Sequence, residues 1–162
     1  MQLEHELGFV ESHQYQERRV NLPTTGRLVD PKNTVVLVVE DNVSNFVLIA
    51  RILGYIGYHC EWKASAYDLV QYADTLPRLD LVLMDIRLPH EDGYVALQKI
   101  RTSQLYRKVP VVAITAESSQ EQMALAHRAG FNGFIGKPLD PDRFPDQVRR
   151  ILKGEPVWEL YS

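Results

Sequence analysis

The sequence predicts an α/β fold in which a doubly wound, five-stranded parallel sheet is covered by helices on both faces. From residue 34 onward, short apolar runs alternate with longer amphipathic segments, as βα units require. The length of 162 residues allows one well-formed core and is too short for two ordinary domains. No repeat or low-complexity tract interrupts this rhythm, so one α/β domain with extensions is expected.

The expected elements follow in order along the chain. Five apolar runs are expected to form the strands: 34–39, 58–62, 79–84, 111–115 and 133–135. Five amphipathic segments are expected to form the helices: 44–56, 65–76, 94–103, 119–129 and 142–153. Gly57 and Gly130 stand where a left-handed C-terminal cap favours glycine. Ser118 and Glu121 have the spacing of a capping box, which predicts the start of the fourth helix.

Two segments flank the predicted domain at 34–154. Residues 1–33 are rich in Glu, Gln, His and Arg and contain turn signals, which indicates an N-terminal extension or linker. Residues 155–162 form a C-terminal tail that carries Trp158 and other large apolar side chains. Such side chains seldom stay fully solvated, so we expect the tail or the extension to pack on the domain or on a second subunit, as a homodimer. A disordered end is the alternative.

Composition excludes several classes of partner. The chain has 18 Lys plus Arg against 21 Asp plus Glu, so no global positive field attracts nucleic acid. No apolar stretch approaches the roughly 18 residues that a membrane span needs, and residues 1–10 do not resemble a signal peptide. The lone cysteine, Cys60, cannot form an internal disulfide. We therefore expect a soluble cytoplasmic protein that contacts neither nucleic acid nor membrane.

The most informative residues follow the predicted strands. In an open doubly wound sheet, ligands bind beyond the carboxyl ends of the strands. The first strand is followed by Glu40 and Asp41, and the third by Asp85. The fourth ends at Thr115 and the fifth runs into Lys137. Three carboxylates, a hydroxyl and an ammonium are therefore expected at one edge of the sheet.

This concentration of acids predicts a metal site. Two like charges about 4 Å apart repel by roughly 4 kcal/mol at an effective dielectric of about 20, so a positive group must lie among them. Mg²⁺ is commonly held by one or two carboxylates, waters and a phosphate, and Glu40, Asp41 and Asp85 have that profile. Once Mg²⁺ and Lys137 neutralise the cluster, a carboxylate can attack phosphorus, and Thr115 can bind a phosphoryl oxygen.

These residues resemble the receiver domains of response regulators, the CheY-like superfamily, from residue 34 to about residue 153. The resemblance implies the flavodoxin-like (βα)₅ fold with strand order 2-1-3-4-5. It implies that Asp85 accepts a phosphoryl group from a histidine kinase or histidine phosphotransfer protein. It also implies that Asp41 binds Mg²⁺ directly, Glu40 through water, and Arg87 through its backbone carbonyl.

The same resemblance assigns a switch and an output surface. Thr115 corresponds to the switch hydroxyl, Lys137 to the family's lysine, and Phe134 to the aromatic residue that turns inward with the hydroxyl. Lys137-Pro138 resembles the family's Lys-Pro pair, whose peptide bond is commonly cis. A downstream protein partner is expected on the face formed by residues 118–153. Because the chain ends soon after the last predicted helix, we expect output by protein contact, with no enzymatic activity.

Within the family, residues 39–42 and 84–89, with Asn45 and Gly93, look most like stand-alone DivK-like regulators and the receivers of hybrid kinases. Arg87 and Glu117 occupy positions that tune phosphoryl lifetime in such domains. We hypothesise that their ion pair shields the acyl phosphate from water.

Other functions fit the sequence less well. Each motif alone is weak, because acids after a strand usually form solvated turns or helix caps. A haloacid-dehalogenase-type phosphatase needs a second acid where Arg87 stands, and a nucleotide-binding domain needs a glycine-rich loop where Glu40 and Asp41 stand. A phosphotransfer intermediate and a phosphorylation-independent pseudo-receiver stay open as alternatives.

Overall fold

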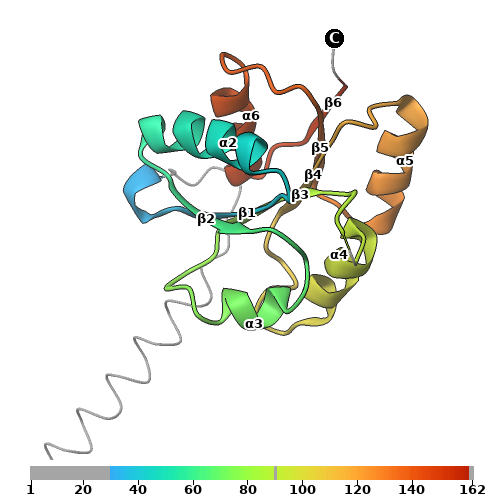
Figure 1. Ribbon diagram of the computed structural model, residues 1–162, viewed down its shortest axis with the longest axis horizontal. Helices are drawn as coiled ribbons and strands as arrows, with labels where there is room; N and C mark the ends of the chain where they lie inside the picture. Colours follow the sequence, from blue (N-terminus) through green and yellow to red (C-terminus); the bar gives the residue numbers. More distant parts are fainter. Residues whose placement is uncertain (1–29, 90, 161–162) are drawn as a thin grey trace, which may run out of the picture.

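The computed structural model describes residues 30–89 and 91–160, which form one parallel sheet with helices on both faces (Figure 1). The sheet order is β2-β1-β3-β4-β5-β6, and every pair of neighbours is parallel. The strands are β1 (Val35–Val39), β2 (His59–Lys63), β3 (Leu81–Asp85), β4 (Val111–Thr115), β5 (Gly133–Gly136) and β6 (Val157–Glu159). The helices are the 3₁₀ turn η1 (Pro31–Asn33) and the α-helices α2 (Val43–Ile56), α3 (Leu69–Ala73), α4 (Gly93–Thr102), α5 (Gln120–Ala129) and α6 (Phe144–Leu152).

The sheet is buried on both faces, which explains its continuous apolar runs. Helices α2 and α6 cover one face, and α3, α4 and α5 cover the other (Figure 1). Alternate residues of β1 serve the two cores: Val36 joins the cluster that contains Phe144 of α6, and Leu37 joins the cluster that contains Leu97 of α4. Burying each such side chain contributes about 1.5–3 kcal/mol, so the two cores fix the strand register.

The two predicted glycine caps are confirmed, and outside α3 the predicted helix ends lie within two residues of the observed ones. Gly57 and Gly130 have φ of 109° and 108° and cap α2 and α5 in the left-handed conformation. The predicted cap of α5 was wrong by one residue, because Ser119 accepts the hydrogen bond from the backbone of Gln122. Helix α3 is shorter than predicted, because its N-cap residue Asp68 has a positive φ of 52° and makes no side-chain capping bond.

The predicted number of strands was wrong: across residues 30–89 and 91–160 the sheet has six strands, in order 2-1-3-4-5-6. Strand β6 pairs with β5, with Val157 opposite Gly133 and Trp158 opposite Phe134. Val157 is 1% exposed, so its burial contributes to the core. Pairing also satisfies the backbone groups that β5 would otherwise present at an open edge.

Side-chain contacts hold β6 between two helices. The ring of Trp158 lies 4.7 Å from the ring of His127 in α5. Glu159 forms an ion pair of 2.8 Å with Arg143 and also accepts a hydrogen bond from Gln147 of α6. This part of the tail therefore packs on its own domain. Packing on the domain was one of the two predicted arrangements, and packing on a second subunit was the other.

The prediction for residues 1–29 falls outside the described residues, as does the end of the tail at 161–162. Across residues 30–89 and 91–160, none of the helices combines the length and the apolar character needed to cross a bilayer.

Candidate metal centre

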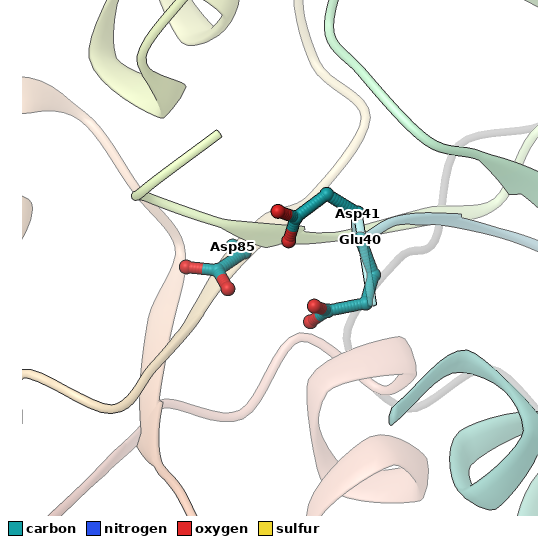
Figure 2. Close-up of side chains that lie close together, drawn as sticks. All are labelled: Glu40, Asp41 and Asp85. Carbon is teal, nitrogen blue, oxygen red and sulfur yellow. The ribbon is translucent and has the colours of Figure 1, made fainter. Parts of the chain in front are cut away.

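Three acids meet at the carboxyl edge of the sheet (Figure 2). Val39 of β1 pairs with Met84 of β3, so the residues that follow them, Glu40 and Asp85, reach the same edge. One carboxylate oxygen from each of Glu40, Asp41 and Asp85 lies within 4.8 Å of the other two. The structure therefore brings together the three acids that the sequence predicted as metal ligands.

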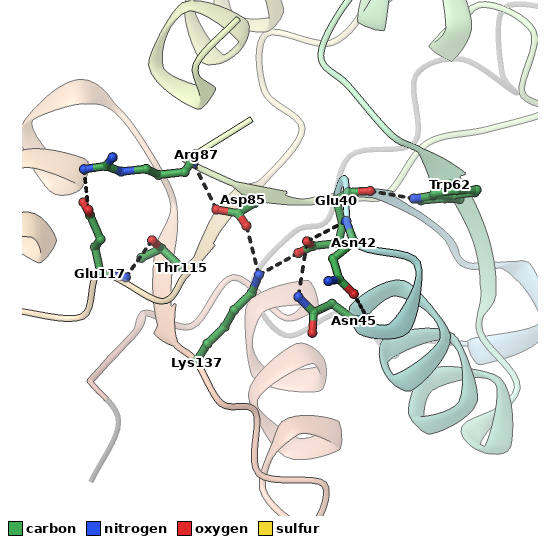
Figure 3. Close-up of polar contacts among 9 residues, drawn as sticks. All are labelled: Glu40, Asn42, Asn45, Trp62, Asp85, Arg87, Thr115, Glu117 and Lys137. Carbon is green, nitrogen blue, oxygen red and sulfur yellow. Dashed lines mark hydrogen bonds and ion pairs between the residues drawn. The ribbon is translucent and has the colours of Figure 1, made fainter. Parts of the chain in front are cut away.

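Lys137 lies among these acids. Its Nζ donates to Oε2 of Glu40 at 2.7 Å and to Oδ2 of Asp85 at 2.9 Å (Figure 3). Burial by itself lowers the pKa of Lys137, but the hydrogen bonds and negative charges of Glu40 and Asp85 outweigh it and raise the pKa above that of an ordinary lysine. Lys137 is therefore fully charged at neutral pH. The backbone places it through a 2.8 Å bond to the carbonyl of Thr115 and a cis peptide bond to Pro138.

Glu40 is held on its other side by the start of α2. Its Oε1 accepts bonds from the backbone of Asn42 at 3.2 Å and from Nδ2 of Asn45 at 3.4 Å. Asn42 also caps α2, because its side chain accepts from the backbone of Asn45 at 3.1 Å. Glu40 is only 2% exposed, and these bonds give its buried carboxylate the polar partners that burial requires.

Asp85 has a different donor on each carboxylate oxygen. Lys137 bonds Oδ2, and the backbone N–H of Arg87 donates to Oδ1 at 3.0 Å. The loop after Asp85 is closed by a 2.8 Å bond from the backbone of Gly93 to that of Ile86. A Cβ on Gly93 would lie 2.9 Å from Cα of Ile86, so only glycine fits this position without displacing the loop.

The remaining predicted residues lie beside this cluster or beneath it. Thr115 is 1% exposed, and its Oγ1 accepts from the backbone of Glu117 at 3.1 Å. The side chains of Arg87 and Glu117 form the hypothesised ion pair (Figure 3). Phe134 is fully buried in the core that also contains residues of α4 and α5.

The residues present fit a hard divalent cation. Three carboxylates and one ammonium leave a net charge of −2, which one divalent ion balances. All the available donor atoms are oxygens, as Mg²⁺ prefers. Glu40, Asp41 and Asp85 would hold the ion, and the backbone carbonyl of Arg87 stays a predicted ligand.

Trp62 was missed by the sequence-based prediction. Its indole Nε1 donates to the backbone carbonyl of Glu40 at 2.7 Å (Figure 3). An aromatic residue in a strand normally indicates core packing, and the pairing of Trp62 with Val38 is not visible in the sequence.

An open parallel sheet with acids at its carboxyl edge occurs in several classes of protein. Lys137 bridges two of the acids and Thr115 is buried, as the sequence resemblance to receiver domains implies. Residues 36–149 match the family model of the response regulator receiver domain, and the chain belongs to this family. Receiver domains are signalling modules of two-component systems whose general property is switching by phosphorylation.

Similar proteins include both sensor kinases and a regulator. The chain is 32% identical over 122 residues to the signal transduction histidine-protein kinase BarA of Shigella flexneri, and 36% over 124 residues to the sensor histidine kinase RcsC of Salmonella typhimurium. Each match covers 75% of this chain but only 13% of the kinase. The chain is also 31% identical over 133 residues to the probable methanogenesis regulatory protein FilR2 of Methanothrix harundinacea, covering 76% of this chain and 83% of FilR2.

Solved structures share the fold. The receiver domain of the sensor histidine kinase PA1611 from Pseudomonas aeruginosa has a TM-score of 0.66 and 34% identity, over 74% of this chain and 97% of that one. That structure contains a magnesium ion coordinated in its active site cleft. The chemotaxis response regulator CheY4 of Vibrio cholerae has a TM-score of 0.67 and 24% identity, over 73% and 98% of the two chains, which shows the fold alone.

Proposed function

We propose that this chain is a single-domain response regulator of a phosphorelay, in which Asp85 accepts a phosphoryl group from a histidine kinase or a histidine phosphotransfer protein. The observation that carries the proposal is the position of Asp85, which lies beside Lys137 and two further acids and has a separate donor on each of its oxygens. The match to FilR2, of which this chain covers 83%, supports the single-domain state, and the DivK-like assignment rests on the resemblance of residues 39–42 and 84–89. The chain would act in the cytoplasm and without nucleic acid.

The proposed reaction is a transfer between two nucleophiles. A carboxylate oxygen of Asp85 forms a bond to phosphorus, while the bond from phosphorus to the donor's histidine nitrogen breaks and its electron pair stays on that nitrogen. The ammonium of Lys137 stabilises negative charge on the transferring oxygens. Mg²⁺, when bound, adds positive charge at the same oxygens. The backbone N–H of Arg87 orients the attacking carboxylate.

The surface beside Lys137 suits a docking phosphodonor. A pocket of about 240 Å³ borders Lys137 and is lined by Leu48, Ile49 and Leu139 among others. Val43 and Leu48 on α2 are 56% and 39% exposed, which gives the donor an apolar surface next to the acceptor.

We propose that phosphorylation is transmitted through β4 and β5. Thr115 of β4 would bond the phosphoryl group, and Phe134 of β5, which pairs with Ala113 of β4, would respond through the pairing of the two strands. The face formed by residues 118–153 would then dock a downstream protein, by a bias between two pre-existing conformations. The division into an extension at 1–33, a receiver domain at 34–154 and a tail at 155–162 belongs to this proposal, with the tail adding a strand to the sheet.

Incubation of the wild-type chain with acetyl phosphate tests the proposal. With Mg²⁺ we expect intact-protein mass to rise by about 80 Da, the mass of one phosphoryl group, and with EDTA we expect no gain. If no adduct forms where a known receiver is labelled, beryllofluoride binding separates the alternatives. A chain that binds beryllofluoride has a short-lived acyl phosphate, and one that does not is a pseudo-receiver.

Arg87→Asn is expected to shorten the life of the acyl phosphate. The Arg87–Glu117 ion pair would cover the phosphoryl group from water, but the two side chains are 70% and 44% exposed, so the effect is modest. An exposed pair contributes about 0.2–1 kcal/mol, which corresponds to a dephosphorylation rate up to about fivefold faster. Loss of the mass adduct over time measures that rate.

The matched control for Arg87→Asn is Arg149→Asn. Arg149 forms a 2.6 Å pair with Asp146 on α6, and these side chains are 50% and 54% exposed. This variant loses a comparable ion pair away from the acids and should keep the wild-type rate. Equal dephosphorylation rates in wild type, Arg87→Asn and Arg149→Asn would show that the Arg87–Glu117 pair does not shield the acyl phosphate.

A further inference from the structure

We propose that Trp62 is a positioning residue for the metal-binding acids, acting through the main chain between Glu40 and Asp41. The inference rests on the proposed function of the site. The indole of Trp62 bonds the backbone carbonyl of Glu40, whereas Lys137 bonds the Glu40 carboxylate (Figure 3). Trp62 would therefore affect metal binding by setting the backbone geometry of Glu40 and Asp41, which we call the acidic turn.

Trp62 extends the connection between β1 and β2 beyond the end of the strands. The ladder of these strands ends with Val39 opposite Lys63. One residue further, the backbone N–H of Glu40 donates to the carbonyl of Lys63 at 3.0 Å, and the carbonyl of Glu40 accepts from Nε1 of Trp62 at 2.7 Å. Both backbone polar groups of Glu40 are therefore held by β2, and the plane of the Glu40–Asp41 peptide is fixed.

The indole is itself fixed by α2. Its ring stacks on that of Phe46, with centroids 5.2 Å apart and planes 17° from parallel. Phe46 lies in the first turn of α2, where its backbone N–H donates to the carbonyl of Asn42 at 3.1 Å. The acidic turn therefore lies between two elements that Trp62 joins, the end of β2 and the start of α2.

This clamp matters because the acids repel one another before metal binds. The Glu40–Asp41 peptide sets the direction in which the Asp41 side chain leaves the backbone, and Asp41 is the exposed member of the cluster. Without the indole N–H, the Glu40 carbonyl loses its partner, and the turn can rotate to separate the charges. Part of the free energy of Mg²⁺ binding would then be used to order the turn, so the affinity for Mg²⁺ would be lower.

Trp62→Phe tests the inference, because it keeps an aromatic ring against Phe46 and removes only the donor. One hydrogen bond corresponds to a weakening of Mg²⁺ binding of about three- to tenfold, measured by following backbone amide resonances during a MgCl₂ titration. The Mg²⁺ concentration for half-maximal labelling by acetyl phosphate should rise by the same factor. The extent of labelling at saturating Mg²⁺ should match wild type, since Asp85 is unchanged.

Tyr72→Phe is the matched control. The Tyr72 hydroxyl donates to Oε2 of Glu61 at 3.2 Å. This variant therefore also removes one aromatic hydrogen-bond donor, and its acceptor Glu61 lies in β2, beside β1. We expect its Mg²⁺ affinity to equal that of wild type. An affinity that falls equally in Tyr72→Phe and Trp62→Phe, or stays unchanged in Trp62→Phe, overturns the inference. Absence of Mg²⁺ binding in wild type instead overturns the proposed function.

A measurement on the wild-type chain covers the case in which Trp62→Phe does not fold. The indole N–H resonance of Trp62, told from that of Trp158 by a Trp158→Phe variant, should be slow to exchange with solvent. It should shift during the MgCl₂ titration with the same Kd as the amide of Asp41. The inference is overturned if the indole N–H exchanges rapidly with solvent or if its chemical shift does not change during the MgCl₂ titration.

Discussion

Asp85→Asn is expected to abolish the Mg²⁺-dependent mass gain of about 80 Da completely. The substitution is nearly isosteric, and its carbonyl oxygen can still accept from the backbone of Arg87 or from Lys137. A neutral amide oxygen is too weak a nucleophile to attack phosphorus, so the fold survives and the chemistry does not. Intact-protein mass after incubation with acetyl phosphate measures the phosphorylation. Circular dichroism measures whether the variant is folded.

Asp146→Asn is the control for this loss. Asp146 lies on α6, where its exposed side chain pairs with Arg149, so this variant should be labelled like wild type. An adduct that persists in Asp85→Asn would contradict the assignment of the acceptor. Peptide mapping would then locate it, and labelling of Glu40 or Asp41 would move the acceptor from β3 to the end of β1.

Gly133→Ala is expected to lower the free energy of unfolding by about 1–3 kcal/mol, the usual cost of overpacking. A Cβ at this position would lie 2.8 Å from the backbone oxygen of Val157 and 3.3 Å from Cγ2 of Val112. Val112 is in the centre of the sheet and cannot yield, whereas β6 has three residues and lies at the sheet's edge. Separation of β6 from β5 is therefore the least costly relief.

Denaturant unfolding and tryptophan fluorescence measure this effect, since Trp158 leaves its place beside His127 when β6 separates. The control is Gly54→Ala in α2, where a Cβ meets nothing within 4 Å and helix propensity predicts a gain of up to about 1 kcal/mol. Unchanged stability and fluorescence in Gly133→Ala would show that β6 does not need the close approach at Gly133. The molar mass of Gly133→Ala in solution also tests whether a released tail forms a homodimer.

The sequence alone determined the first five strands of the sheet, the order of its helices and the composition of the site. Apolar runs bounded by caps such as Gly57 and Gly130 depend on local interactions, so their positions can be predicted within a few residues. Parallel strands bring their carboxyl ends to one edge, and this rule was enough to place Glu40, Asp85 and Lys137 together. The residues that follow each strand are therefore enough to predict which side chains meet at this edge, even when the other tertiary contacts are unknown.

Only the tertiary structure decided the sixth strand and the part played by Trp62. Residues 157–159 are too few to show a strand pattern, and they become a strand because β5 offers an open edge and α5 and α6 offer partners for Trp158 and Glu159. Trp62 stands 22 positions from Glu40, and their hydrogen bond exists only because β2 lies beside β1. Both features depend on contacts between segments that are distant in the sequence, and local patterns do not encode such contacts.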